Sequence, residues 1–111
     1  MTKKLQKIFK NFGWSVHQVN GCYENEKCYE LENWSPAGED LIVVLYGNTD
    51  EELIQDFIQY YEDFDPEAHA LETVNVPGAP GISVLLDDAN DIDEMLFNLK
   101  IQLEKFRREE L

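Results

Sequence analysis

The sequence predicts an α+β fold, a three-stranded antiparallel meander covered on one face by N-terminal, central and C-terminal helices. Three observations predict it: apolar residues recur at helical spacing in three segments, three short strand-like segments lie between the first two of these, and only short turns connect them. The length of 111 residues with 43% apolar content suits one domain, residues 1–111.

Residues 2–12 predict the first helix. Its apolar residues fall at the spacing of one helix face: Leu5, Ile8, Phe9 and Phe12. Thr2 is a suitable N-cap, and Gly13 is expected to end the helix.

Three strands are expected next, over residues 14–19, 28–34 and 41–46. The first two alternate apolar and polar side chains, and the third is a short run rich in β-branched residues. Asn20-Gly21 indicates a hairpin, and the polar residues 24–27 favour a loop longer than two residues. Residues 35–40 form a turn.

The central helix is expected to begin at a capping box, residues 49–52. Its apolar stripe contains Leu53, Ile54, Phe57, Ile58, Tyr61 and Phe64.

Beyond residue 64 the pattern is less regular. Pro66 is expected to start one short turn, residues 71–76 an extended piece or edge strand, and residues 82–86 a short helix in preference to a strand. A long final helix is predicted for residues 91–108, with acids at its start and bases at its end. Its apolar face contains Ile92, Met95, Leu96, Leu99, Leu103 and Phe106.

The formal net charge of −14 argues against direct binding to nucleic acid or to anionic membranes. No apolar run reaches the roughly 20 residues of a membrane-spanning helix, and the first residues lack the apolar stretch of a signal peptide. We therefore expect a cytoplasmic protein. Residues 11–99 contain twenty acidic residues and one basic residue, Lys27, which gives this segment a charge of −19.

Two acidic clusters are the candidate partner-binding surfaces. The first comprises Glu52, Asp56, Glu62, Asp63, Asp65 and Glu67, with Tyr60 as an aromatic anchor at its edge. The second comprises Asp87, Asp88, Asp91 and Asp93. Such carboxylates either belong to solvated faces of a soluble protein, or imitate part of the field of a phosphate backbone and occupy a basic cleft.

Catalysis and metal binding have little support in the sequence. No Gly-rich phosphate loop, GxSxG or HExxH motif occurs, and His17 and His69 are expected to be surface or hydrogen-bonded groups. Residues 87–94 depart from an EF-hand loop, since the sixth residue is Ile92 rather than Gly. Cys22 and Cys28 are expected to be reduced thiols near a hairpin. We expect no enzyme, no cofactor and no metal.

Three stretches carry a resemblance: Asn33–Asp40 (NWSPAGED), Tyr61–Ala70 (YEDFDPEAHA) and Val76-Pro77-Gly78 leading to Leu86–Ala89. They resemble small acidic proteins encoded by phages and conjugative elements of gut bacteria, across about residues 14 to 104. The resemblance implies that the protein is encoded by a mobile element, and it implies no reaction mechanism. Because such elements often carry acidic inhibitors of restriction enzymes and CRISPR nucleases, the resemblance implies that broad class.

The expected function is therefore that of an acidic inhibitor that binds a basic, nucleic-acid-binding host protein. The alternative is a structural or assembly protein of the element, a homodimer formed through the apolar side of the first or last helix. The basic first ten residues either pair with the acidic body or contact another copy.

Overall fold

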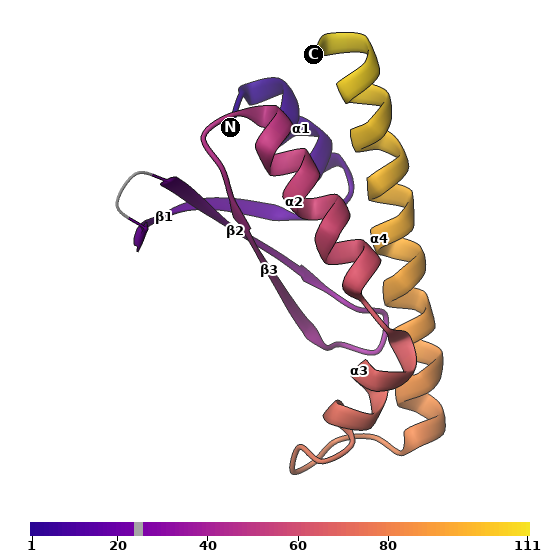
Figure 1. Cartoon of the computed structure of the whole chain (residues 1–111). Helices are drawn as coiled ribbons and strands as arrows, with labels where there is room; N and C mark the ends of the chain where they lie inside the picture. Colours follow the sequence, from indigo (N-terminus) through magenta and orange to yellow (C-terminus); the bar gives the residue numbers. More distant parts are fainter. Residues whose placement is uncertain (24–25) are drawn as a thin grey trace.

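A computed structural model describes residues 1–23 and 26–111 of the chain and confirms the α+β prediction. Four helices and a three-stranded sheet make up the described part (Figure 1). The elements are α1 (Lys3–Asn11), β1 (Ser15–Tyr23), β2 (Glu26–Trp34), β3 (Asp40–Tyr46), α2 (Asp50–Asp63), α3 (Pro66–Thr73) and α4 (Ile82–Glu110).

The sheet is an antiparallel meander in the order β1-β2-β3. β1 runs further than expected, because the pairing resumes at Tyr23↔Glu26 after a register shift beyond Val19. Glu26 and Lys27 therefore belong to β2, and the expectation that they form a longer loop is wrong. Residues 24 and 25 of that expected loop lie outside the described residues.

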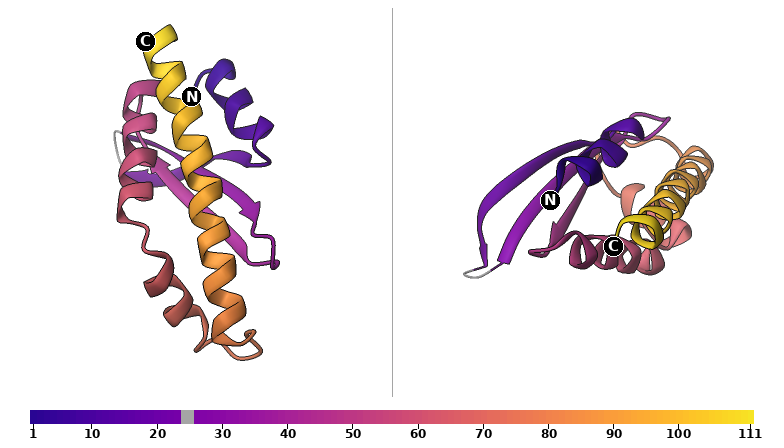
Figure 2. Two further views of the ribbon diagram at one scale, coloured as in Figure 1. Left: turned by 90° about the vertical axis from the view of Figure 1, so that its right-hand side faces the viewer. Right: turned by 90° about the horizontal axis from the view of Figure 1, so that it is seen from above.

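Helices cover one face of the sheet only. In β3 the side chains of Leu41, Val43 and Leu45 are buried, whereas those of Ile42 and Val44 are exposed. This alternation is the period of two expected of a half-buried strand. Seen from above, the helices lie on one side of the sheet and the other side is open (Figure 2).

The main core lies between the sheet and helices α1, α2 and α4. Phe9 of α1 meets Phe57 of α2 edge-on, with ring centroids 6.1 Å apart. The helices contribute Leu5, Phe9, Leu53, Ile54, Phe57, Ile58, Ile92, Leu96, Leu99, Leu103 and Phe106 to this core. The three predicted apolar stripes are thus confirmed except at Phe12, whose side chain is exposed. Ile8, Tyr61, Phe64 and Met95 are partly buried against this core.

The predicted starts of the first and central helices are also confirmed. The Thr2 hydroxyl accepts a hydrogen bond from the Leu5 N–H at 3.3 Å, and the Thr49 hydroxyl accepts one from the Glu52 N–H at 3.2 Å. Gly13, with a φ of 89°, follows the end of α1 in a conformation that other residues rarely adopt.

The segment after residue 64 corrects the prediction. Residues 66–73 form a two-turn helix, α3, where one short turn and then an extended piece were expected. The short helix expected at 82–86 and the long helix expected at 91–108 are one continuous helix of 29 residues, α4.

α3 and the start of α4 extend beyond the sheet, as Figure 1 shows, and the molecule measures 42 × 31 × 21 Å. We call residues 66–90 the arm. The arm has a small core of its own, formed by Ala70, Leu85 and Ala89.

Candidate protein-binding site

The loop between β2 and β3, residues 35–39, contacts residues from two later segments of the chain, His69 of α3 and Asp88 of α4. Asp88 of α4 is buried, with 4% of its surface exposed. Its carboxylate accepts hydrogen bonds from the Ser35 hydroxyl at 2.6 Å and from the Ala37 N–H at 2.9 Å. The same Ser35 oxygen accepts a bond from the Glu39 N–H, so the loop is fixed from both sides.

A second contact joins this loop to α3. His69 Nε2 lies 2.9 Å from both carboxylate oxygens of Glu39. The His69 ring also packs against Phe64, with centroids 5.3 Å apart. His69 is therefore a hydrogen-bonded group, as expected, and its partner is 30 residues away in the chain.

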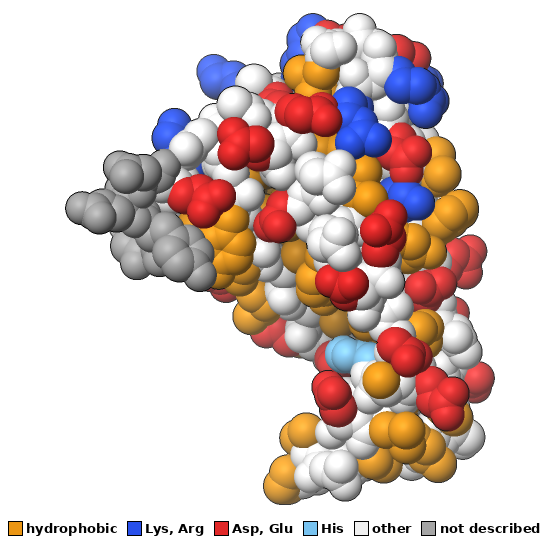
Figure 3. Space-filling view, viewed as in Figure 1, with side chains coloured by type: hydrophobic (Ala, Val, Ile, Leu, Met, Phe, Trp, Pro, Cys, Tyr) orange, Lys and Arg blue, Asp and Glu red, His pale blue; other side chains and the backbone are white. Residues whose placement is uncertain are grey.

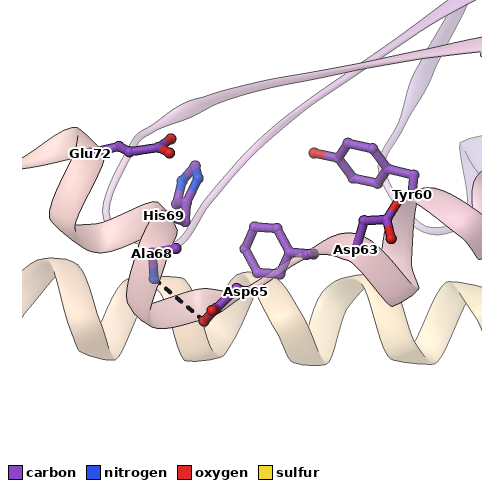
Figure 4. A pocket seen from close by; sticks show the side chains of 7 residues that line it. Tyr60, Asp63, Asp65, Ala68, His69 and Glu72 are labelled. Carbon is purple, nitrogen blue, oxygen red and sulfur yellow. Dashed lines mark hydrogen bonds between the residues drawn. The ribbon is translucent and has the colours of Figure 1, made fainter.

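A pocket of about 220 Å³ opens where α2 ends and α3 begins (Figure 4). Two aromatic and three acidic side chains line it, together with a methyl group and an imidazole. The lining residues are Tyr60, Asp63, Phe64, Asp65, Ala68, His69 and Glu72.

The electrostatics of this pocket are negative. Asp63, Asp65 and Glu72 line it, Glu39 lies behind His69, and no Lys or Arg is among its lining residues. Burial, and secondarily the negative charge of Glu39, raise the pKa of Tyr60 above its ordinary value. The Tyr60 hydroxyl thus stays protonated, as a neutral hydrogen-bond donor.

The predicted site residues fall into two groups. The first group is exposed and makes no ion pair in the described chain: Glu52, Glu62, Asp63, Asp65, Glu67, Asp87 and Asp91. Tyr60 is 37% exposed beside them, as an anchor at the edge of the first cluster would be.

The second group, Asp56, Asp88 and Asp93, is buried or half-buried. Asp88 is inside the protein, which removes its carboxylate from any partner surface. Asp56 is half-buried and accepts the Tyr46 N–H at 2.9 Å, and Asp93 is also half-buried. Asp65, though exposed, caps α3 by accepting the N–H groups of Glu67 and Ala68. In the second cluster, Asp87 and Asp91 are therefore exposed, whereas Asp88 is buried and Asp93 is half-buried.

Glu39 and Glu72 were not among the predicted residues, although both lie at the pocket or directly behind it. Glu72 follows His69 by three residues and Ala68 by four, so helical spacing was a usable signal once residues 66–73 were assigned to a helix. No local pattern pairs Glu39 with His69, because they are brought together only by the fold.

Positive charge gathers at the opposite end of the molecule. Figure 3 shows Lys and Arg side chains at the upper end, near α1 and the end of α4, and acidic side chains extending down to the arm. Lys4 pairs with Glu110 at 3.1 Å and Arg107 with Glu51 at 3.6 Å. Of the basic residues near the N-terminus, Lys4 pairs with an acid of the same chain, Glu110 at the C-terminal end of α4.

The apolar sides of the first and last helices, proposed for a homodimer, are used inside the protein. Leu5 and Phe9 of α1, like Leu96, Leu99 and Leu103 of α4, are fully buried in the core. Assembly through either helix would have to use other residues.

The cysteine prediction involves Cys22, whose side chain lies outside the part of the chain that the structure describes. Cys28 is buried. Among the described residues, no group of three or more His, Cys, Asp or Glu side chains is placed to hold a metal ion.

None of the helices in the described ranges combines the length and apolar character needed to cross a bilayer. Comparisons with protein families, curated proteins and solved structures find no match for this chain.

Proposed function

We propose that the protein is an inhibitor, encoded by a mobile element, that binds a basic nucleic-acid-binding protein of the host through its acidic patch. We define the acidic patch as the exposed carboxylates of α2 and α3 that lie outside ion pairs in the described chain: Glu52, Glu62, Asp63, Glu67 and Glu72. A restriction or CRISPR protein is the proposed target class, because the family resemblance implies that setting.

The observation that carries the proposal is the position of Glu62 and Asp63. Both lie in the last turn of α2, where there is no basic residue. The partial negative charge at a helix C-terminus disfavours acids by about 0.3–1 kcal/mol each. These two carboxylates lower the stability of the fold. A role in binding a partner would explain why acidic residues occupy these positions.

The patch suits a protein that normally holds nucleic acid. Carboxylates on a rigid helix present negative charge at fixed positions, and a basic cleft recognises a phosphate backbone largely by its charge. Nucleic acid itself would be repelled, because the protein carries −14. The partner is thus a basic protein surface, and the inhibitor competes with DNA or RNA for it.

The test is a pull-down from nuclease-treated host lysate with the tagged protein, followed by elution with rising salt. We expect a nucleic-acid-binding defence protein that is also released by added DNA. Retention of no such protein would overturn the proposal.

A charge-reversal pair makes the test specific to the patch. The double variant Glu62→Lys, Asp63→Lys is expected to weaken partner binding at least about tenfold and to keep the protein folded, because lysines suit the end of a helix. Asp56 is left unchanged, since it accepts the Tyr46 N–H. The matched control, Glu26→Lys with Glu109→Lys, makes the same charge change at exposed positions outside the patch. Equal weakening by both variants would mean that net charge, and not the patch, drives binding.

A further inference from the structure

The pocket between α2 and α3 differs from the rest of the acidic patch because its walls are aromatic. Tyr60 and Phe64 come from the end of α2, and Glu72 and His69 from α3. In Figure 4 the Tyr60 hydroxyl and the side chains of His69 and Glu72 are directed to the same side of the helices. A side chain entering there meets ring surface and carboxylate together.

Two of the lining groups are already engaged and hold the pocket in shape. Asp65 caps α3 through the N–H groups of Glu67 and Ala68. His69 bonds to Glu39 across the gap to the β2–β3 loop. These contacts fix the walls before any ligand arrives, so little ordering has to accompany binding.

The remaining carboxylates are available to a ligand. Asp63 uses one oxygen, Oδ1, to accept a bond from Gln59 Nε2 at 3.1 Å, which leaves the other oxygen open. Glu72 makes no hydrogen bond or ion pair with any described residue, and its side chain borders the pocket. An anion would be repelled by both groups, and a neutral apolar group would leave them desolvated without a partner.

We propose that this pocket receives the guanidinium group of one arginine from the bound partner protein, an inference that rests on the proposed function. The carboxylates of Asp63 and Glu72 come from two different helices and both border the pocket, and a guanidinium offers five N–H donors to such acceptors. The rings of Tyr60 and Phe64 supply flat surface for the planar cation to stack on. A lysine ammonium is a compact point charge and leaves part of a pocket of about 220 Å³ unfilled.

The probes are three short glycine-flanked peptides with a central arginine, lysine or citrulline, capped at both ends. Citrulline has nearly the shape of arginine without its charge. We titrate each into isotope-labelled protein and follow the backbone amides by proton–nitrogen correlation NMR. We expect the arginine peptide to shift amides of residues 59–73 and to bind more tightly than the lysine peptide. We expect no binding of the citrulline peptide. Equal shifts from arginine and citrulline, or shifts spread over the whole surface, would overturn the proposal.

Two matched variants on α3 separate the pocket from general negative charge. Glu72→Gln removes a carboxylate that lines the pocket, whereas Glu67→Gln removes an exposed carboxylate one turn earlier that does not line it. Glu72→Gln is expected to weaken binding of the arginine peptide about fivefold. Glu67→Gln is expected to leave it nearly unchanged, and equal losses would contradict a specific site.

The outcomes separate this inference from the proposed function. If the pull-down recovers a DNA-displaceable host protein but the arginine peptide does not map to residues 59–73, only the arginine pocket is overturned. If the peptide maps there and no such host protein is recovered, the pocket is supported and the inhibitor proposal fails.

Discussion

At the scale of single residues, Asp88 differs most from what its sequence neighbourhood suggests. It follows Asp87 directly, yet Asp87 is exposed and Asp88 is buried. Adjacent residues on a helix point about 100° apart, so one carboxylate faces solvent and the other faces the β2–β3 loop. Asp88 therefore connects the arm to the sheet.

We expect Asp88→Ala to reduce the free energy of unfolding by about 2–4 kcal/mol, because it removes the acceptor from the Ser35 hydroxyl and the Ala37 N–H. Urea denaturation measures this change. The neighbouring Asp87→Ala is the control and should alter stability by less than about 0.5 kcal/mol. Equal effects of the two variants would show that the buried hydrogen bonds contribute nothing specific.

On the open face of the sheet, two carboxylates of neighbouring strands interact, Glu32 of β2 and Asp40 of β3. The carboxylate of Asp40 raises the pKa of Glu32 above its ordinary value, with desolvation and Glu30 as smaller causes. A raised carboxyl pKa means that the folded state binds the proton more tightly than the unfolded state. The pair therefore lowers stability as pH rises above the ordinary carboxyl pKa.

We expect Asp40→Asn to lower the pKa of Glu32 toward its ordinary value, as measured by carbon NMR titration of the side-chain carboxyl groups. Stability at neutral pH should rise and should depend less on pH across the mildly acidic range. A Glu32 pKa that does not move in the variant would contradict the assigned cause.

At the scale of elements, the region from residue 66 to residue 110 is more helical than the pattern indicates. Pro66 suits the first turn of a helix, and Asp65 caps α3. Asp87 and Asp88 resemble a helix end because short acidic residues favour caps and turns. Ser35 and Ala37 satisfy the Asp88 carboxylate, so α4 passes through this point without a break.

Proline tests the continuity of α4. Asn90→Pro is expected to cost about 3 kcal/mol or more, because proline within a helix removes one backbone hydrogen bond and clashes with the preceding turn. Ser83→Pro places the same residue in the first turn of α4 and should cost far less. Thermal or urea unfolding compares the two. If Asn90→Pro were tolerated as well as Ser83→Pro, two separate helices would describe this region better than one.

At the scale of the whole molecule, the arm differs from the rest of the protein in both shape and charge. The radius of gyration is 14.8 Å, above the roughly 13 Å typical of a compact domain of about 100 residues, since the arm extends past the sheet. Acidic side chains continue to the arm, while basic ones gather near α1 and the end of α4. The arm therefore carries acidic side chains and no Lys or Arg, whereas the end with α1 carries both signs.

Because most of the acidic side chains lack an ion pair in the described chain, their mutual repulsion should be relieved by salt. We expect the melting temperature to rise by about 4 °C between low salt and half-molar sodium chloride, equivalent to about 1 kcal/mol for a domain of this size. Differential scanning calorimetry measures the rise. The rise should be smaller in the variant Glu62→Lys, Asp63→Lys, and an equal rise would show that repulsion at the patch is not its source.

The sequence alone determined the fold class, the three core-forming helices and the three strands. Those features depend on local periodicity and caps, such as the Leu5–Phe9 face and Thr49, which act over a few residues. The sequence also located the acidic clusters, because charge is a property of composition.

The tertiary structure decided which of those acids are at the surface. Asp88 became buried and Asp56 half-buried because residues 53 and 10 positions earlier in the chain, Ser35 and Tyr46, bring donors to them. The pocket beside Tyr60 and the contact of His69 with Glu39 depend on helices and loops that meet only after folding. Hydrogen bonds between distant residues leave no periodic signal in a single sequence, so only the packed structure reveals them.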